Sequence, residues 1–379
     1  MTLTRLRHRR RAVAAALTGV ICSTLAACGN SEAPTASGAN SFDPAVFPRS
    51  TFSELSGTLA WYDSSGGLTT EAKNNTVWQN FTSLTGVPVQ AEYNNGQTTK
   101  LRAAEQNGNV PWSLVEFGTG GDFFQAENDG LLQKLDTTKV PVDKLPPSAV
   151  TPHGIRVEEN GAVLVWNKNA LGGKTPTSTM DIFDTANYPG KRCLYKHPKS
   201  AGTLEVALRA DGVPPDKIYP LDVPRAFNKL ATIKDRTVWW NSGSTVIQLL
   251  TNGECSMGLV WSGRVFDAIE NQKLPLDFTW KGGVTTAAYW GIPKNAPNPE
   301  LGNAAIAMWI LDRKGQIGFV NQTTYTTPII GLGPESYSPQ VRRYLAAGSN
   351  VEDTVTEDSQ YYAKHLPELS AALASFQAR

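Results

Sequence analysis

A basic cluster lies immediately before a predicted helix in the middle of the chain. Lys196, His197 and Lys199 precede Ser200, and a helix is predicted over 204–210. Positive side chains and the free backbone N–H groups at the start of a helix both attract negative charge. The cluster therefore predicts a site for a small anion, such as a carboxylate, a phosphonate or the acidic end of a zwitterion. The alternative is that these residues are solvated charges on a loop.

Three carboxylates are candidates for binding an amine. Glu116 lies in a predicted strand, and Glu158 and Glu159 lie together in a polar segment. A buried ammonium group is costly unless an opposite charge compensates it, so an amine ligand needs such acids. We expect at least one of the three to be simply exposed.

Ten tryptophans are many for 379 residues, and some of the aromatic residues are placed to contact a ligand. Near the end of a strand, a ring face can stack on a sugar or cover a cation. The aromatic residues in such positions are Trp240, Trp261, Tyr289 and Trp290. Trp61, Trp78 and Trp309 lie within predicted strands or helices, and we expect them in the core.

The chain lacks the sequence motifs of common enzymes and metal sites. It contains no Gly-x-Ser-x-Gly, no phosphate-binding Walker loop, no His-Glu-x-x-His and no paired-cysteine spacing. His153, His197 and His365 have no second histidine near them in sequence. We therefore expect no catalysis, no cofactor and no bound metal.

The N-terminus has the pattern of an export signal. Five arginines precede an apolar stretch over 12–27 that is too short to span a membrane. The Leu-Ala-Ala-Cys ending resembles the lipobox of bacterial lipoproteins, which implies cleavage before Cys28 and its acylation. We expect 1–27 to be the signal, Cys28 to anchor the protein to the extracytoplasmic face of the cell membrane, and 28–50 to be a flexible tether. An ordinary secreted protein with a chance cysteine is the alternative.

Charge and cysteine content narrow the class of protein further. Without residues 1–27 the chain loses five arginines and no acids, so 35 basic residues become 30 against 34 acidic ones. No Lys/Arg run remains, which argues against nucleic acid as a partner. Export permits disulfides, and we expect Cys193 and Cys255 to pair, with two separate buried thiols as the alternative.

Predicted strands and helices alternate along the chain, which argues for α/β architecture with a mostly parallel sheet covered by helices on both faces. The pattern restarts after about residue 160, which suggests two lobes with a ligand crevice between them. The strands are predicted over 57–63, 87–93, 113–117, 162–166, 191–195, 238–240 and 257–261. We also expect a Thr245–Gln248 capping pair and a helical C-terminal part, including 341–377.

Several short segments follow one another in a distinctive order in the second half of the chain. They include Trp239-Trp240-Asn241-Ser242-Gly243, Gly253-Glu254, Met257-Gly258, Trp261-Ser262-Gly263-Arg264 and Ile292-Pro293-Lys294. In this order and spacing they resemble the periplasmic-type solute-binding proteins of ABC importers, especially the spermidine/putrescine-like branch. The likeness covers most of 56–330, and its specificity comes from the order and spacing of the pieces.

The resemblance implies a two-lobed fold of the type II periplasmic-binding-protein kind, with strands near 161–167 and 289–293 crossing between the lobes. It implies a small polar solute, an ABC permease and its ATPase as partners, and we expect a monomer. The expected lobes are 51–160 plus about 291–320, and 161–290 plus about 321–379.

We expect the solute to contact residues that mostly correspond to the cleft loops of relatives. The set is Ser64, Ser65, Phe117, Thr119, Glu159, Lys196, Lys199, Ser200, Ser242, Trp261, Tyr289 and Thr327. Polyamine binders often carry an aspartate where this chain has Ala288, and acids where it has Lys196 and Lys199. These differences favour an anionic or zwitterionic solute. A polyamine receptor, a surface glycan-binding or adhesion lipoprotein and an anchored hydrolase are the alternatives.

Overall fold

The computed structural model describes residue 45 and residues 47–52, 54–93 and 97–378. The predicted signal, Cys28 and nearly all of the predicted tether lie outside the described residues. All elements named below belong to one compact unit, Asn40–Arg379. Among the described residues, no helix has the length and apolar character needed to cross a membrane.

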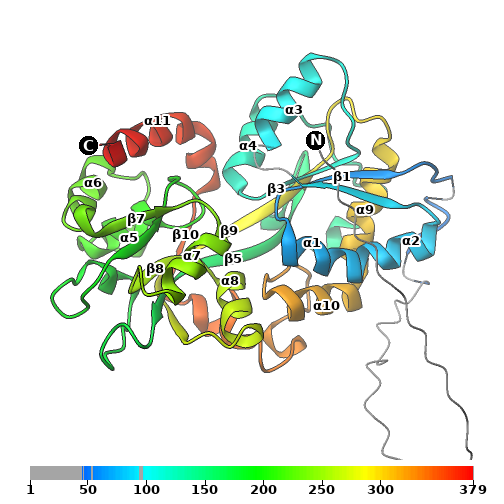
Figure 1. Ribbon diagram of the computed structural model, residues 1–379. Helices are drawn as coiled ribbons and strands as arrows, with labels where there is room; N and C mark the ends of the chain where they lie inside the picture. Colours follow the sequence, from blue (N-terminus) through cyan, green and yellow to red (C-terminus); the bar gives the residue numbers. More distant parts are fainter. Residues whose placement is uncertain (1–44, 46, 53, 94–96, 379) are drawn as a thin grey trace, which may run out of the picture. The chain divides into compact units, whose positions relative to one another are not determined.

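A ten-stranded sheet runs through this unit (Figure 1). Its strands are β1 Leu59–Asp63, β2 Val89–Tyr93, β3 Leu114–Phe117, β4 Val150–Thr151, β5 Gly154–Asn167, β6 Arg192–Tyr195, β7 Thr237–Trp240, β8 Met257–Trp261, β9 Leu276–Gly291 and β10 Val355–Thr356. The order is β2-β1-β3-β9-β5-β8-β6-β7, with β10 beside β9 and β4 beside β5.

Two parallel groups of strands flank a pair of long antiparallel strands. β1 pairs in parallel with β2 and β3, and β6 pairs in parallel with β7 and β8. β5 and β9 pair antiparallel with each other, with a register shift in β5 between Arg156 and Glu158, and they link the two groups. The predicted crossing strands are therefore confirmed, and each parallel group follows from the alternation of strands and helices in the sequence.

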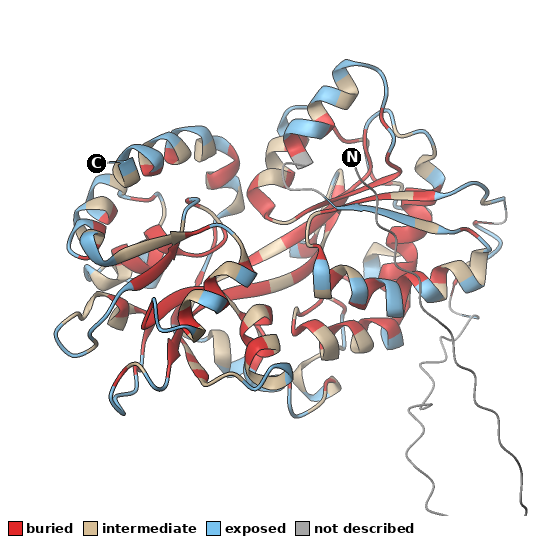
Figure 2. Ribbon diagram, in the orientation of Figure 1, coloured by how far each residue is buried: buried red, intermediate tan, exposed pale blue. Residues whose placement is uncertain are grey.

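Helices surround both groups of strands (Figure 1). Those with the first group are α1 Gly67–Lys73, α2 Gln79–Thr85, α3 Gln97–Gln106, α4 Gly120–Asn128, α9 Pro299–Leu311 and α10 Arg313–Thr323. Those with the second are α5 Thr203–Ala210, α6 Val223–Ala231, α7 Gly243–Thr251, α8 Ser262–Phe266 and α11 Ser359–Ala378. Figure 2 shows the buried residues concentrated along the sheet and on the helix faces turned toward it.

A tryptophan cluster forms part of the core beside β1 and β9. Trp61, Trp78 and Trp309 are buried as predicted. Trp290 stacks on Trp78 with ring centroids 5.2 Å apart and is fully buried, so it belongs to the core rather than to a ligand surface. Trp240 is also fully buried.

Two local predictions are wrong. The N-terminal cap of α7 is Ser242 rather than the predicted Thr245–Gln248 pair, because the helix already begins at Gly243. The Ser242 hydroxyl accepts a hydrogen bond from the N–H of Thr245. The segment 341–358 is not a continuous helix. It forms short 3-10 turns and then β10, which pairs with β9, so only α11 keeps the predicted helical form.

Cys193 and Cys255 form a disulfide, as predicted, with their Cα atoms 5.8 Å apart. The bond joins β6 to the residues just before β8, and both cysteines are fully buried. It closes a loop between residues 62 positions apart, for which chain entropy gives a stabilisation of roughly 4 kcal/mol.

Candidate ligand-binding site

A cavity of about 650 Å³ lies where the ends of strands from both parallel groups meet β5 and β9. This volume suits a small molecule, and the carboxyl ends of strands are the usual ligand site in α/β proteins. The residues lining it that matter below are Ser64, Ser65, Thr119, Asp122, Glu158, Asn160, Tyr195, Lys196, His197, Lys199, Ser200, Trp261, Arg264, Ala288 and Tyr325.

The structure brings together much of the predicted contact set. The predicted residues that line the cavity are Ser64, Ser65, Thr119, Lys196, Lys199, Ser200 and Trp261. The predicted residues that lie outside its lining are Phe117, Glu159, Ser242, Tyr289 and Thr327.

Most of the predicted residues outside the lining are adjacent in sequence to a residue that lines the cavity. Successive side chains of a strand point to opposite faces, so Glu158 faces the cavity, whereas Glu159 pairs with Arg156 at 2.8 Å. In the same way Tyr289 turns into the core and stacks on Phe123, at 4.9 Å between ring centroids.

The other predicted residues outside the lining are either buried or cap a helix. Phe117 is fully buried, and Gly118 lines the cavity in its place. Ser242 caps α7, and its neighbour Asn241 lines the cavity. Thr327 is buried away from the lining.

A group of buried charges, here called the acid cluster, lies at one side of the cavity and consists of Asp63, Lys73, Glu116 and Glu158. Lys73, at the end of α1, forms an ion pair with Glu116, and its Nζ lies 3.6 Å from Glu158 Oε1. The side chains of all three of these residues are at most 2% exposed. The cluster therefore holds one cation against three carboxyl groups.

Glu116 is the best compensated carboxylate of the acid cluster. Its oxygens accept hydrogen bonds from Ser64 Oγ at 2.9 Å, Ser65 Oγ at 2.6 Å and Trp290 Nε1 at 2.8 Å, besides the contact with Lys73. Burial alone would raise its pKa, but Lys73 and these hydrogen bonds outweigh burial and lower it. Glu116 is therefore ionised.

Lys73 is held among aromatic rings. Its Nζ lies 5.3 Å from the ring centroid of Trp61, 5.6 Å from that of Phe319, 5.8 Å from that of Trp290 and 5.9 Å from that of Trp309. Ring faces at this distance stabilise a cation. Burial would lower the pKa of Lys73, but Glu116, Glu158 and Asp63 outweigh burial and raise it, so Lys73 stays charged.

Glu158 is the member of the acid cluster that faces the cavity. Burial, reinforced by Glu116 and Asp63 and opposed by Lys73, raises its pKa to about 8. Among the described residues its Oε2 has no hydrogen-bond partner. Glu158 also lies directly opposite Ala288 in the β5–β9 register. The cavity therefore has a carboxyl group on β5, across from the β9 position where polyamine binders often carry an aspartate.

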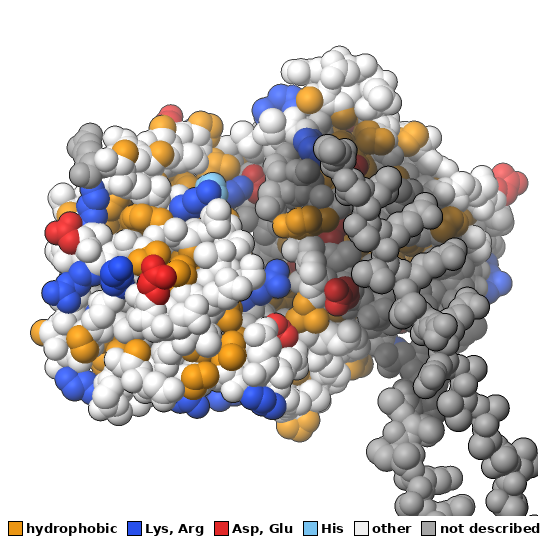
Figure 3. Space-filling model, viewed as in Figure 1, with side chains coloured by type: hydrophobic (Ala, Val, Ile, Leu, Met, Phe, Trp, Pro, Cys, Tyr) orange, Lys and Arg blue, Asp and Glu red, His pale blue; other side chains and the backbone are white. Residues whose placement is uncertain are grey.

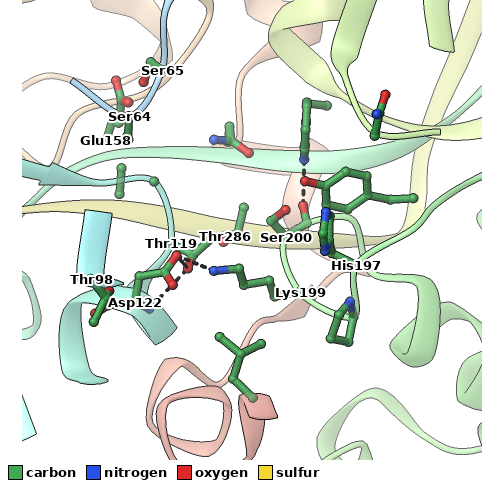
Figure 4. A pocket seen from close by; sticks show the side chains of 18 of the residues that line it. Ser64, Ser65, Thr98, Thr119, Asp122, Glu158, His197, Lys199, Ser200 and Thr286 are labelled. Atoms are coloured by element: carbon green, nitrogen blue, oxygen red, sulfur yellow. Dashed lines mark hydrogen bonds and ion pairs between the residues drawn. The ribbon is translucent and has the colours of Figure 1, made fainter. Parts of the chain in front are cut away.

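Basic side chains line the other parts of the cavity. Lys199 forms an ion pair with Asp122 of α4, which connects the loop after β6 to the first group of helices. Burial, together with Lys196 and Lys199, lowers the pKa of His197, which favours its neutral form. Figure 4 shows Glu158 beside Ser64 and Ser65, apart from Lys199 and His197. Figure 3 shows basic side chains and a histidine gathered at the edge of a hollow in the visible face.

Arg264, near the start of α8, is a half-buried cation in the cavity wall. No carboxylate or hydrogen-bond acceptor among the described residues pairs with it. A Cβ atom at Gly243 would lie 2.8 Å from Arg264 Cγ, so this glycine leaves room for the arginine chain. Its guanidinium is therefore available to a ligand.

Aromatic residues form the wall next to the basic loop. The rings of Tyr195 and Trp261 meet edge to face with centroids 5.2 Å apart. Trp261 Nε1 donates a hydrogen bond of 2.8 Å to the carbonyl of Ser200, which fixes the loop against this wall. Within the part of the chain that the structure describes, no group of three His, Cys, Asp or Glu residues is placed to hold a metal.

The sequence matches the model of the bacterial extracellular solute-binding proteins over residues 76–341, which is more than half of the chain. The chain belongs to this family. This solute-binding protein is 28% identical over 322 residues to the gamma-aminobutyric acid-binding protein of Pseudomonas aeruginosa, covering 83% of the present chain and 89% of the relative. Its 25% identity to the spermidine/putrescine-binding periplasmic protein of Escherichia coli extends over 182 residues, which is 45% of this chain and 51% of that one.

Solved structures show the same fold. A gamma-aminobutyric acid (GABA) receptor is 32% identical, with a TM-score of 0.77, and the match covers 85% of this solute-binding protein and 98% of that chain. A binding protein of A. tumefaciens B6 in complex with glucopine is 26% identical, with a TM-score of 0.76 and coverage of 85% and 100%. The predicted type II periplasmic-binding-protein fold is confirmed.

Family membership establishes the general role of this solute-binding protein. It is an extracytoplasmic receptor of an ABC importer that binds a small solute and works with a permease and its ATPase. The chemistry of the solute must be argued from the cavity.

Proposed function

We propose that this receptor captures a small zwitterion with an ammonium group at one end and a carboxylate at the other, of the class of gamma-aminobutyric acid. The observation that carries this proposal is a pair of groups in the cavity wall that have no partner within the described part of the chain, the Oε2 atom of Glu158 and the guanidinium of Arg264. In this proposal the solute is delivered chemically unchanged.

The carboxylate end is assigned to Arg264. A guanidinium presents several N–H groups in one plane and binds a carboxylate through two parallel hydrogen bonds. The remaining cations of the wall are less suited, because Lys199 is already paired with Asp122, Lys196 is exposed to solvent, and the lowered pKa of His197 favours its neutral form. Arg264 thus supplies the charge that an anionic group needs when it leaves water.

The ammonium end is assigned to the wall formed by Glu158 and Asn160. Glu158 Oε2 and Asn160 Oδ1 are buried oxygens without hydrogen-bond partners among the described residues, and both residues line the cavity. Buried polar atoms are normally satisfied, and because both residues line the cavity, these oxygens are placed to accept hydrogen bonds from an ammonium group of the ligand.

The polyamine alternative is less well supported by the cavity. A diamine would need a separate buried carboxylate for each ammonium group. Asp122 is used by Lys199, and Glu116 is used by Lys73 and three further donors. Glu158 is then left as the acid for a ligand, while Lys196, Lys199 and Arg264 would repel a second positive charge.

The relatives point the same way. The protein of Pseudomonas aeruginosa that aligns with most of this chain is named for gamma-aminobutyric acid, and so is the similar solved receptor. The likeness to the spermidine/putrescine-binding protein extends over only about half of either chain.

We further propose how the receptor is held and how it closes. Acylation of Cys28 would anchor it as a monomer to the membrane after removal of residues 1–27. The lobes would be those predicted, 51–160 plus about 291–320 and 161–290 plus about 321–379, bending about β5 and β9. A ligand that contacts both lobes would favour the closed state, in which Lys199 meets Asp122.

Isothermal titration calorimetry of the purified protein tests the ligand class. We expect tight binding of gamma-aminobutyric acid and weaker binding of butyrate and putrescine. Butyrate lacks the ammonium group, and putrescine carries a second ammonium group in place of the carboxylate. Losing a hydrogen-bonded charge pair costs about 2 kcal/mol, so Arg264→Gln should weaken binding about 30-fold.

The matched control is Arg225→Gln, because Arg225 is an exposed arginine of α6 that pairs with Asp211 outside this cavity. It should bind the zwitterion like the unmodified protein. Tight putrescine binding that Arg264→Gln leaves unchanged would exclude the zwitterion proposal.

A further inference from the structure

Glu158 has fewer hydrogen-bond donors around it than the other two carboxyl groups of the acid cluster, so its negative charge is less well compensated. Glu116 accepts hydrogen bonds from four side chains, and Asp63 accepts them from the N–H groups of Ser65 and Gly66 and from the Thr70 hydroxyl. Among the described residues, Glu158 has one cationic neighbour, Lys73, at 3.6 Å, and its Oε2 atom has no hydrogen-bond partner.

Charge counting then singles out Glu158. Lys73 already balances Glu116, and Asp63 lies beside them as a further carboxyl group, whose pKa is raised by burial and by Glu116. A third buried carboxylate would bring the cluster to two excess negative charges in a region of low dielectric, which is costly. The least compensated group is the one that becomes neutral, and it is also the one that opens onto the cavity.

We propose that Glu158 carries a proton in the empty receptor and releases that proton to water when the ammonium group of a ligand binds beside it. This inference rests on the proposed function and deepens it. The exchange conserves charge in the cluster, since one positive charge leaves as a proton while one arrives as the ammonium group. No other reactant is needed, because the O–H bond of the carboxyl group is the only bond that breaks.

The groups facing Glu158 support this exchange. Lys73 of α1, Asp63 at the end of β1 and Glu116 of β3 surround it inside the protein, and burial with Glu116 and Asp63 raises its pKa to about 8. The Tyr325 phenol, which follows α10, is partly buried and is influenced by both Glu158 and Arg264, and desolvation raises its own pKa.

The residues opposite and next to Glu158 on the strands place no further charge beside it in the cavity. Opposite it on β9 stands Ala288, and the next residue of its own strand, Glu159, pairs with Arg156 outside the cavity. Arg264 is a half-buried cation of the cavity wall without an ion-pair partner among the described residues, and the proposed function assigns it to the carboxylate of the ligand.

The sign of the pH dependence follows from the exchange. Below about pH 8 the empty receptor must lose a proton to bind, so affinity for the ammonium ligand rises with pH by up to tenfold per unit. Above that value the carboxylate is already formed, and the affinity becomes flat until the amine of the ligand itself loses its proton.

Calorimetry at pH 7 in two buffers with different ionisation enthalpies counts the protons released. With gamma-aminobutyric acid as the probe, we expect nearly one proton per ligand. Glu158→Gln should release none and bind at least tenfold more weakly. The matched control is Glu159→Gln, which changes the adjacent acid outside the cavity and should keep both the proton release and the affinity. Tight binding without proton release would overturn the proposal while leaving the proposed function intact.

A second measurement needs no ligand. The infrared difference between the ligand-free protein and Glu158→Gln at pH 7 should contain the carbonyl band of a protonated carboxylic acid, and this band should disappear above about pH 8. If no zwitterion binds, the proposed function fails, and the infrared band still decides whether Glu158 is protonated. Absence of the band overturns the inference.

Discussion

Replacing Lys73 by methionine should destabilise the protein strongly, although a lysine is usually an exposed and replaceable residue. Lys73 is fully buried and is the cation that balances Glu116. Methionine has a similar length and would keep the contacts with the surrounding rings, so the main loss is electrostatic. Removing one member of a buried ion pair costs about 3–5 kcal/mol, because the remaining charge is left uncompensated. This is a large part of the stability of a typical domain.

The loss should depend on pH in a definite direction. Without Lys73, burial raises the folded-state pKa of Glu116 above its unfolded value. A group with a raised folded pKa favours folding most below its unfolded pKa, and this contribution is lost as pH rises. The Lys73→Met protein should therefore be closest to the unmodified protein near pH 4 and furthest from it above pH 7.

Urea unfolding of the purified proteins at several pH values measures both effects. Lys100→Met is the matched control, because Lys100 pairs with Glu92 on the surface with 43% of its side chain exposed, and surface pairs contribute about 1 kcal/mol or less. The double variant Lys73→Met with Glu116→Gln should recover part of the loss at pH 7. If Lys73→Met costs no more than Lys100→Met at pH 7, our account of the acid cluster is wrong.

Three further predictions concern the surrounding structure. Reducing the Cys193–Cys255 bond should lower the free energy of unfolding by roughly 4 kcal/mol, measured in urea with and without reductant. Ser242→Ala should cost about 1 kcal/mol in thermal unfolding because it removes a helix cap, whereas Gln248→Ala should cost less. Glu357 is buried and its pKa is raised by burial to about 8, so its contribution to stability is lost as pH rises from about 4.5 through 8. In Glu357→Gln the melting temperature should fall less over this pH range than in the unmodified protein. An unchanged dependence of melting temperature on pH would contradict this role of Glu357.

Most of the fold could be predicted because it depends on local patterns. The alternation of strand and helix patterns marks β1 to β3 and β6 to β8 with errors of only a few residues. The helical prediction over 341–377 was wrong in its first half because tertiary pairing decides there. β10 pairs with β9, which periodicity within the segment cannot reveal.

The candidate site was harder to predict because the decisive contacts join distant parts of the chain. The sequence indicates the correct segments, but the choice between adjacent residues, such as Glu158 and Glu159 within β5, depends on which face of the strand meets the cavity. The acid cluster joins positions 63, 73, 116 and 158, and only the fold brings them together. One local signal was available, since Lys73 precedes Val77 and Phe81 at a spacing of four residues and thus lies on the apolar side of its helix.

The pairing of β5 with β9 has two register shifts, and the one between Arg156 and Glu158 lies beside the carboxyl group that meets the cavity. An irregularity of this kind bends a strand locally. If the proposed lobes move about β5 and β9, a substitution at position 158 that changes the cargo stands next to one of the points where the strand bends. A redesign of the cavity at this position must therefore be checked for its effect on closure as well as on affinity.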